Sequence, residues 1–194
     1  MKLILGDCLE EMPKLSGIDA VITDPPYPDY HAELYGYDER PILYLDKFDC
    51  RQLVFWTSKM DFILDYTAIH IWDKMCGVGS MYERLFERKG GNAYMLFNYY
   101  LINSTVAAQY TGDTFYNHPS QKPVKLMSCL VKTFHKTGLI LDPFMGSGTT
   151  LRAAKDLNRK AIGIEIEEKY CEIAARRMQQ EVLDFEPQAE QEKE

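Results

Sequence analysis

The feature that most constrains the fold is a short apolar segment that ends at an acid and two prolines. Residues 18–23 are rich in β-branched side chains, and Asp24-Pro25-Pro26-Tyr27 follows directly. Proline cannot continue a strand ladder and extends the residue before it, so the pattern predicts a buried strand ending at Asp24. Open α/β sheets bind ligands at the carboxyl edge of their strands. We therefore expect Asp24 to lie in a ligand site.

The chemistry of this segment suits a planar amine. Asp24 offers a carboxylate, the two prolines offer carbonyl oxygens without competing N–H groups, and Tyr27 offers an aromatic face. Two acceptors match the two hydrogens of an amine, and a ring can stack on its plane.

Alternating apolar segments predict one α/β domain over residues 1–180. A mostly parallel sheet with helices on both faces follows from strands at 2–5, 18–23, 53–57, 68–72, 138–142 and 161–165, with helices between them. Residues 28–41 are rich in tyrosine and predict either a loop that closes over a ligand or one packed by its own side chains. Residues 76–117 are less regular and predict a small variable insertion.

Composition and charge exclude several classes of protein. An apolar content of 46% excludes wholesale disorder, and five cysteines without a Cys-x-x-Cys pair predict reduced thiols rather than disulfides or a zinc site. No segment has the apolar length of a signal peptide or a membrane span, so we expect a soluble, cytoplasmic protein. The net charge of −7 is unfavourable for nucleic-acid binding, but residues 181–194 form an acidic tail that we expect to be disordered.

A second pattern predicts a nucleoside site. Asp142 ends a strand, Gly146 and Gly148 punctuate the turn into a helix, and Glu165 ends the next strand, 19 residues beyond Gly146 (165 − 146). This spacing lets a strand-end acid reach ribose hydroxyls. Leu151 stands where a dinucleotide motif has its third glycine, and no lysine follows Gly148 as in a phosphate loop. The turn therefore suits a nucleoside without a pyrophosphate, which disfavours a nicotinamide oxidoreductase.

Together these segments resemble the S-adenosylmethionine-dependent amino-methyltransferases of DNA, which act on N6 of adenine or N4 of cytosine. Asp24-Pro25-Pro26-Tyr27 precedes residues 118–123 (His-Pro-Ser-Gln-Lys-Pro), 142–150 (Asp-Pro-Phe-Met-Gly-Ser-Gly-Thr-Thr) and 163–166 (Gly-Ile-Glu-Ile). This permuted order resembles the β group of the family, and the match extends to about Arg177. The resemblance implies a Rossmann-like methyltransferase fold.

The resemblance also implies roles for individual residues. The catalytic residues would be Asp24, Pro25, Pro26 and Tyr27. Ser120 and Lys122 would meet the methionine carboxylate, and Glu165 would bind the ribose hydroxyls. The remaining cofactor-binding residues would be Asp7 and Cys8 at the adenine, with Asp142, Phe144, Gly146, Ser147 and Gly148 at the methionine and ribose.

The implied reaction transfers a methyl group to N6 of adenine in a flipped-out base of double-stranded DNA, yielding S-adenosylhomocysteine without a metal. Asp as the first residue of the tetrad accompanies adenine more often than cytosine in this family, so N4 of cytosine stays an alternative. Methyltransferases of protein glutamine or RNA usually have Asn there, and a non-catalytic DNA-binding module is a further alternative. Residues 76–117 would recognise the target, Arg84, Arg88 and Lys89 would contact DNA or form a solvated face, and a homodimer could supply contacts from both subunits.

Overall fold

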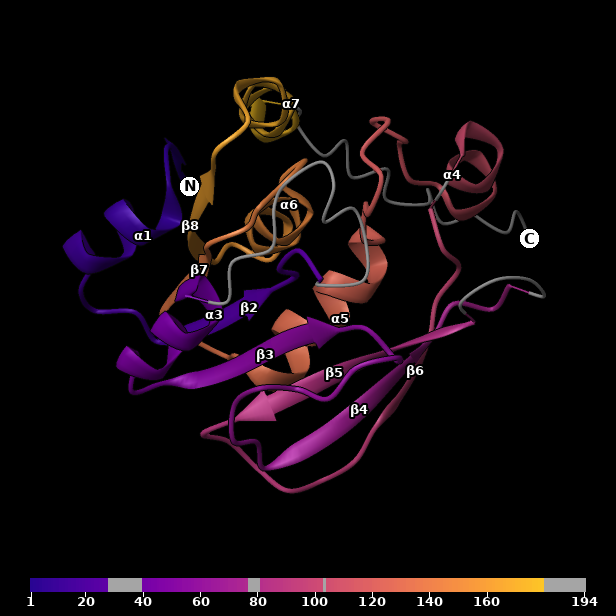
Figure 1. Ribbon diagram of the computed structural model, residues 1–194. Coiled ribbons are helices and arrows are strands. Elements are labelled where there is room, and N and C mark those ends of the chain that lie inside the picture. The colour runs from indigo at the N-terminus through magenta and orange to yellow at the C-terminus, as the bar shows by residue number, and fades with distance from the viewer. Residues whose placement is uncertain (28–39, 77–80, 103, 180–194) are drawn as a thin grey trace, which may run out of the picture.

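Figure 1 shows a computed structural model of the chain, which describes residues 1–27, 40–76, 81–102 and 104–179. Of the tyrosine-rich segment 28–41, only Arg40 and Pro41 belong to the described residues, and the acidic tail 181–194 lies wholly outside them. No helix in the described ranges has the length and apolar character needed to cross a membrane.

The described strands form one sheet in the order β1-β8-β7-β2-β3-β5-β4-β6. Their bounds are β1 Lys2–Leu5, β2 Ala20–Thr23, β3 Arg51–Trp56, β4 Ala68–Asp73, β5 Tyr82–Arg88, β6 Leu96–Asn98, β7 Leu139–Asp142 and β8 Lys160–Glu165. Neighbours pair in parallel from β1 to β3, and β5 alone among the described strands runs against its neighbours β3 and β4. The predicted mostly parallel sheet is confirmed.

The helices connect these strands and cover both faces of the sheet. Their bounds are α1 Cys8–Glu11, η1 Met12–Lys14, α3 Arg40–Tyr44, η2 Leu45–Lys47, α4 Thr105–Thr111, α5 Val124–Phe134, α6 Thr149–Asp156 and α7 Glu168–Gln179. One face packs against α5, α6 and α7 through residues such as Ile22, Phe55 and Leu130. The opposite face packs against α1 and the two 3-10 helices through residues such as Val21 and Val54. Successive side chains of β2 and β3 thus enter different cores, because they alternate between the faces of a strand.

The direction of β5 decides which of its residues reach the ligand edge. Trp56 at the end of β3 pairs with Arg84, and Asp73 at the end of β4 pairs with Tyr82. The beginning of β5 therefore lies at the same edge as the carboxyl ends of its neighbours. Residues 82–88 are an internal strand of the sheet, so this part of the predicted insertion 76–117 is built into the common core (Figure 1). Whether the range recognises a target stays a prediction.

Candidate active site

A cavity of about 440 Å³ opens at the carboxyl edge of β1, β8, β7 and β2. It joins segments that are far apart in the sequence. The predicted site residues that line it are Asp7, Cys8, Asp24, Pro25, Pro26, Tyr27, Ser120, Lys122, Asp142, Phe144, Gly146, Ser147 and Glu165. We call the carboxyl ends of β1, β7 and β8 together with the turn 143–148 the cofactor half of the cavity. The target half consists of the carboxyl ends of β2 and β4, the beginning of β5, and Lys122.

Asp24 follows the last residue of β2 and is held by two side chains. One carboxylate oxygen accepts a hydrogen bond from the Tyr27 hydroxyl, and the other accepts one from the Lys122 ammonium. Burial raises the pKa of Asp24 above its ordinary value, although Lys122 opposes this shift. The Tyr27 ring is itself buried and meets Trp56 edge-on, with 5.6 Å between the ring centroids.

A charge network extends from Asp24 through the target half. The Lys122 ammonium lies 3.2 Å from a carboxylate oxygen of Glu83 on β5, and the other oxygen of Glu83 lies 2.7 Å from the Lys74 ammonium. The same Lys122 ammonium lies 5.0 Å from the centroid of the Phe55 ring. Burial alone would lower the pKa of Lys122, but Asp24 and Glu83 outweigh it and raise that pKa. Lys122 is therefore a buried cation shared by two carboxylates.

This placement gives Lys122 partners beyond the one that the resemblance implies. The family pattern directs it to the cofactor's carboxylate, which stays a prediction, and the structure pairs it with Asp24 and Glu83. Glu83 and Lys74 escaped the sequence analysis altogether. Neither belongs to a motif, and Glu83 is one of several charged residues in the segment 82–88, so the sequence carried no signal that singled it out.

Glu165 in the cofactor half is oriented by backbone groups. One of its carboxylate oxygens accepts from the N–H of Gly146 at 2.9 Å, and the other accepts from the N–H of Glu167 at 2.8 Å. Burial raises its pKa, and these backbone hydrogen bonds oppose the shift. Because a carboxylate offers about four lone-pair sites, Glu165 retains acceptor capacity for hydroxyl groups in the cavity.

The two glycines of the turn have different surroundings. Gly146 has φ +51°, and a Cβ there would lie 2.7 Å from Nε2 of His118, so a side chain would be strained and would clash. Gly148 has φ +78°, and a Cβ there would lie 2.7 Å from Cβ of Ala174 on α7. Gly148 is not among the residues that line the cavity. It permits the close approach of α7, and its contact with a cofactor stays a prediction.

Asp142 and Asp7 also have structural partners. Asp142 is buried, accepting from the Thr23 hydroxyl at 2.7 Å and from the Phe144 N–H at 3.2 Å, and burial raises its pKa to about 6. Asp7 caps α1 by accepting from the Leu9 N–H at 2.8 Å. Burial raises the pKa of Cys8 to about 12, which keeps its thiol neutral. These residues hold the cavity wall in shape whether or not they also contact a ligand.

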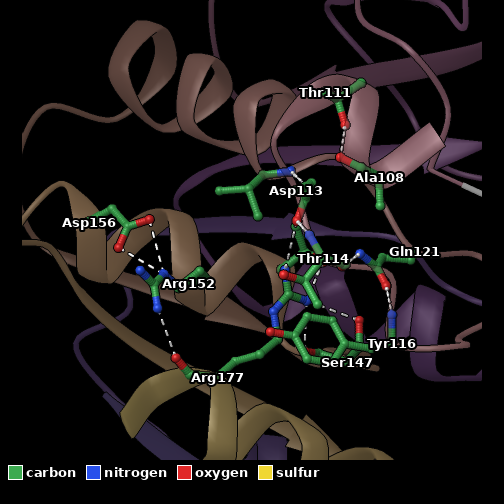
Figure 2. A network of polar contacts seen from close by, with 12 residues as sticks. Ala108, Thr111, Asp113, Thr114, Tyr116, Gln121, Ser147, Arg152, Asp156 and Arg177 are labelled. Carbon is green, nitrogen blue, oxygen red and sulfur yellow. Dashed lines mark hydrogen bonds and ion pairs between the residues drawn. The ribbon is translucent and has the colours of Figure 1, made fainter. Parts of the chain in front are cut away.

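Arg177 on α7 holds the cofactor turn through hydrogen bonds. Figure 2 shows its side chain reaching from α7 toward Ser147 and Tyr116. One guanidinium nitrogen donates to the carbonyl of Ser147 at 2.9 Å and to the hydroxyl of Thr149 at 3.0 Å. The guanidinium carbon lies 4.5 Å from the centroid of the Tyr116 ring, and the whole residue is 1% exposed. Sequence reasoning gave Arg177 no role beyond marking the end of the family match.

The three basic residues predicted to contact DNA lie outside the cavity lining. Arg88 is 4% exposed and donates to the carbonyl of Asp65 at 2.6 Å and to the side chain of Gln52 at 2.6 Å. The prediction of a DNA contact is wrong for Arg88, because its guanidinium is buried and bonded within the protein. Arg84 is half-buried and donates to the carbonyl of Thr57, while Lys89 is exposed. DNA contact by Arg84 and Lys89 stays a prediction.

Metal ligation has no candidate among the residues that the structure describes. In those ranges no group of three or more His, Cys, Asp or Glu side chains is placed to hold an ion. All five cysteines lie in the described ranges and carry free thiols.

Comparison with known families decides the relationship of this chain. The model for N6/N4 methyltransferases, described as DNA methylase, matches residues 52–176, which is more than half of the chain. The chain belongs to this DNA methylase family. The predicted family is therefore confirmed, and the match includes both β5 and the turn 143–148 of the cofactor half.

Individual relatives of this DNA methylase agree with the assignment. Putative methylase YubD of Escherichia coli (strain K12) is 27% identical over an alignment covering 91% of this chain and 89% of its own. Type II methyltransferase M2.DpnII of Streptococcus pneumoniae is 48% identical over 65 residues, which are 33% of this chain and 24% of that protein. The latter match thus spans about a quarter of that relative's length.

Solved structures confirm the predicted fold. The M1.HpyAVI–SAM complex superposes with a TM-score of 0.67 at 22% identity, covering 92% of this chain and 99% of the other. PvuII DNA methyltransferase, titled cytosine-N4-specific, superposes with a TM-score of 0.63 at 18% identity, covering 90% and 85%. At this level of identity the likeness establishes the methyltransferase fold and nothing finer.

Proposed function

We propose that this protein transfers the methyl group of S-adenosylmethionine to N6 of an adenine that has been flipped out of double-stranded DNA. The single observation that carries the proposal is the shared cavity. Asp24 and the cofactor turn around Gly146 line the same hollow at the sheet edge, so an amine and a methyl donor can meet there. Family membership supports the reaction class, and the M1.HpyAVI–SAM complex supports the identity of the donor.

The residues of the cofactor half fit a nucleoside donor. Gly146 lacks the side chain that would clash with His118, Glu165 presents an oriented carboxylate, and the half-buried Phe144 adds an apolar wall. In this proposal Glu165 accepts from the ribose hydroxyls, and Asp7 with Cys8 borders the adenine. Ser120 and Lys122 border the methionine carboxylate. When bound, S-adenosylmethionine supplies an electrophilic sulfonium methyl group.

Asp24 and Pro25 orient the amine that receives the methyl group. The lone pair of a nucleobase amine is delocalised into the ring, which makes the amine a poor nucleophile. When the Asp24 carboxylate accepts one amine hydrogen and the Pro25 carbonyl accepts the other, the nitrogen becomes pyramidal and directs its lone pair away from the ring. Such positioning can contribute about 7–11 kcal/mol when the reacting atoms are held roughly 3–3.5 Å apart.

Tyr27 has two roles in this proposal. Its hydroxyl orients Asp24, and its ring stacks on the flipped base. Flipping costs a few kcal/mol, and stacking on an aromatic ring returns about 1–3 kcal/mol. Because the two terms are comparable, Tyr27 governs how well the base is held.

The choice of adenine rests on Asp24 as the first residue of the tetrad. N4 of cytosine is the second candidate, because the cytosine-N4-specific PvuII enzyme shares this fold. The range 76–117 recognises the DNA sequence in this proposal, and a homodimer supplies DNA contacts from both subunits.

One experiment tests the reaction and the base together. The purified protein is incubated with plasmid DNA and methyl-labelled S-adenosylmethionine, the DNA is digested to nucleosides, and the labelled nucleoside is identified by chromatography. Label in N6-methyldeoxyadenosine supports the proposal, and label in N4-methyldeoxycytidine selects the second candidate. Absence of label from DNA, under conditions where calorimetry shows that the donor binds, contradicts both.

A further inference from the structure

The target half contains an alternating row of charges that extends beyond the residues assigned to the reaction. Asp24, Lys122, Glu83 and Lys74 follow one another, and each neighbouring pair is in ion-pair contact. The exposed side-chain fractions are 18%, 7%, 12% and 9%. Two negative and two positive charges balance, so this largely buried row carries no net charge.

Burial makes each member of the row depend on the next. A buried ion that loses its partner is strongly destabilised, and charges act over short distances with little screening inside a protein. Without Glu83, the Lys122 ammonium would have Asp24 as its one carboxylate partner in the row. Its positive charge would then be concentrated on the group that must accept a hydrogen from the target amine.

Glu83 divides the attraction of Lys122 between two carboxylates. One of its oxygens contacts Lys122, and Lys74 compensates its other oxygen. This arrangement is possible because β5 is antiparallel and begins at the ligand edge, where Trp72 on β4 pairs with Glu83.

We propose that Glu83 is a positioning residue for methyl transfer, which, supported by Lys74, holds Lys122 so that Asp24 keeps an oriented and available carboxylate. The proposal rests on the proposed function and assigns a role to two residues outside every recognised motif. Glu83 acts through Lys122 and does not touch the substrates.

The charged and titratable groups around Asp24 and Lys122 set the expected pH dependence. They are Tyr27, Glu83, Asp142 and His118, which come from different segments of the chain. Glu83 raises the pKa of Asp24 by repulsion and raises the pKa of Lys122 by attraction. Removing its charge should therefore move the acidic and the alkaline limits of activity to lower pH.

The test compares Glu83→Gln with Glu87→Gln on the same strand. Glu87 is also a buried acid, but it pairs with Arg51 and with His70 at 2.9 Å, away from Asp24.

Glu83→Gln should lower kcat by about 10- to 100-fold, as expected for a misplaced catalytic group, and shift both pH limits downward. Because Lys122 keeps its positive charge in this variant, cofactor affinity should change by less than about 3-fold, a difference below 1 kcal/mol. Glu87→Gln should leave both pH limits in place. Equal losses of kcat in the two variants, with unchanged pH limits, would overturn the proposal.

A conservative variant and a measurement without turnover complete the test. Glu83→Asp keeps the charge and should retain more activity than Glu83→Gln, and the reverse order counts against the proposal. Nitrogen NMR of the lysine ammonium groups, with Lys122→Met to assign the signal, should show slow proton exchange at Lys122 that becomes faster in Glu83→Gln. If the wild-type protein shows this signal but methylates no DNA, the proposed function fails, and with it the role in methyl transfer, while the contact between Glu83 and Lys122 is confirmed. If it methylates DNA and Glu83→Gln changes neither exchange nor pH limits, the positioning role fails alone.

Discussion

The two halves of the cavity are held by different kinds of contact. In the cofactor half, backbone N–H groups orient Glu165, and Arg177 fastens the turn from behind through the carbonyl of Ser147. In the target half, side-chain charges hold one another, because Asp24 depends on Lys122 and Lys122 on Glu83. The backbone contacts of Glu165 stay within one strand-turn-helix-strand unit, because Gly146 and Glu165 are 19 positions apart. The charge row joins more distant segments, because Asp24 and Lys122 are 98 positions apart.

The two halves should respond differently to substitution, because they are held by different kinds of contact. The cofactor half presents a largely fixed surface, which suits a ligand that is the same in every turnover. The target half presents a carboxylate whose availability depends on the balance of its neighbours. Substitutions in the two halves should therefore affect binding and transfer separately.

The largest expected effect comes from the carboxylate of the target half. Asp24→Ala removes the acceptor for the target amine and should lower methyl transfer by about 10³-fold or more, while cofactor binding stays nearly intact. Incorporation of labelled methyl groups into DNA measures methyl transfer, and calorimetry measures cofactor affinity. Substantial residual turnover would refute the role of Asp24, and a parallel loss of cofactor affinity would remove the separation between the halves.

Arg177 tests the support behind the cofactor half. Arg177→Met removes a buried cation from the acceptors of Ser147 and Thr149 and leaves the Asp113 carboxylate, 3.9 Å away, without this partner, so it should lower the free energy of unfolding by roughly 3–5 kcal/mol. Urea unfolding measures the loss. The neighbouring Arg176→Met is the matched control, because the Arg176 side chain is 72% exposed and pairs with Glu172 on the surface. Similar losses in both variants would show that Arg177 adds little.

Asp142 lies between the halves and should give stability a particular pH dependence. Burial raises its pKa from 3.8 to about 6, so the folded protein binds its proton more tightly than the unfolded chain does. The protonated Asp142 therefore adds to the free energy of unfolding below about pH 4, and this added stability is lost as the pH rises through about 6. The free energy of unfolding should fall by about 3 kcal/mol over that range. Asp142→Asn should remove it, so that the stability of the variant relative to wild type rises between these pH values. Parallel curves for the two proteins, from urea unfolding at several pH values, would contradict the assignment.

The smallest of these effects concerns Glu165 in the cofactor half. Glu165→Ala should weaken cofactor binding by about 1–3 kcal/mol, the usual range for a lost hydrogen-bonding group, with a smaller change in the rate at saturating cofactor. Calorimetry measures the affinity, and the exposed Glu168→Ala serves as control. Unchanged affinity in Glu165→Ala would mean that the acid only orients the Gly146 turn.

The comparison also shows which parts of the protein could be predicted. The strand ending at Asp24 was recognisable because a β-branched segment followed by two prolines has few other interpretations. The helix after Gly148 was recognisable because glycines precede a regular apolar pattern, and the Asp142–Glu165 spacing belongs to one continuous unit. Residues 82–88 and 96–98 were not identified as strands, since their burial depends on long-range pairing with β3 and β4. Arg88 was assigned to the surface because the pairing that buries its strand joins distant segments and leaves no local pattern in the sequence.

By itself, the sequence determined the α/β fold, the family, the order of the motifs and the segments that meet at the ligand edge. These properties depend on local patterns, because strand endings, glycine turns and helix beginnings are encoded within a few residues. Only the tertiary structure decided that Lys122 faces Asp24, that Glu83 and Lys74 complete the row, and that Arg177 lies behind the cofactor turn. Each of these contacts joins residues from separate elements, and their partners are chosen by strand direction and packing rather than by spacing along the chain.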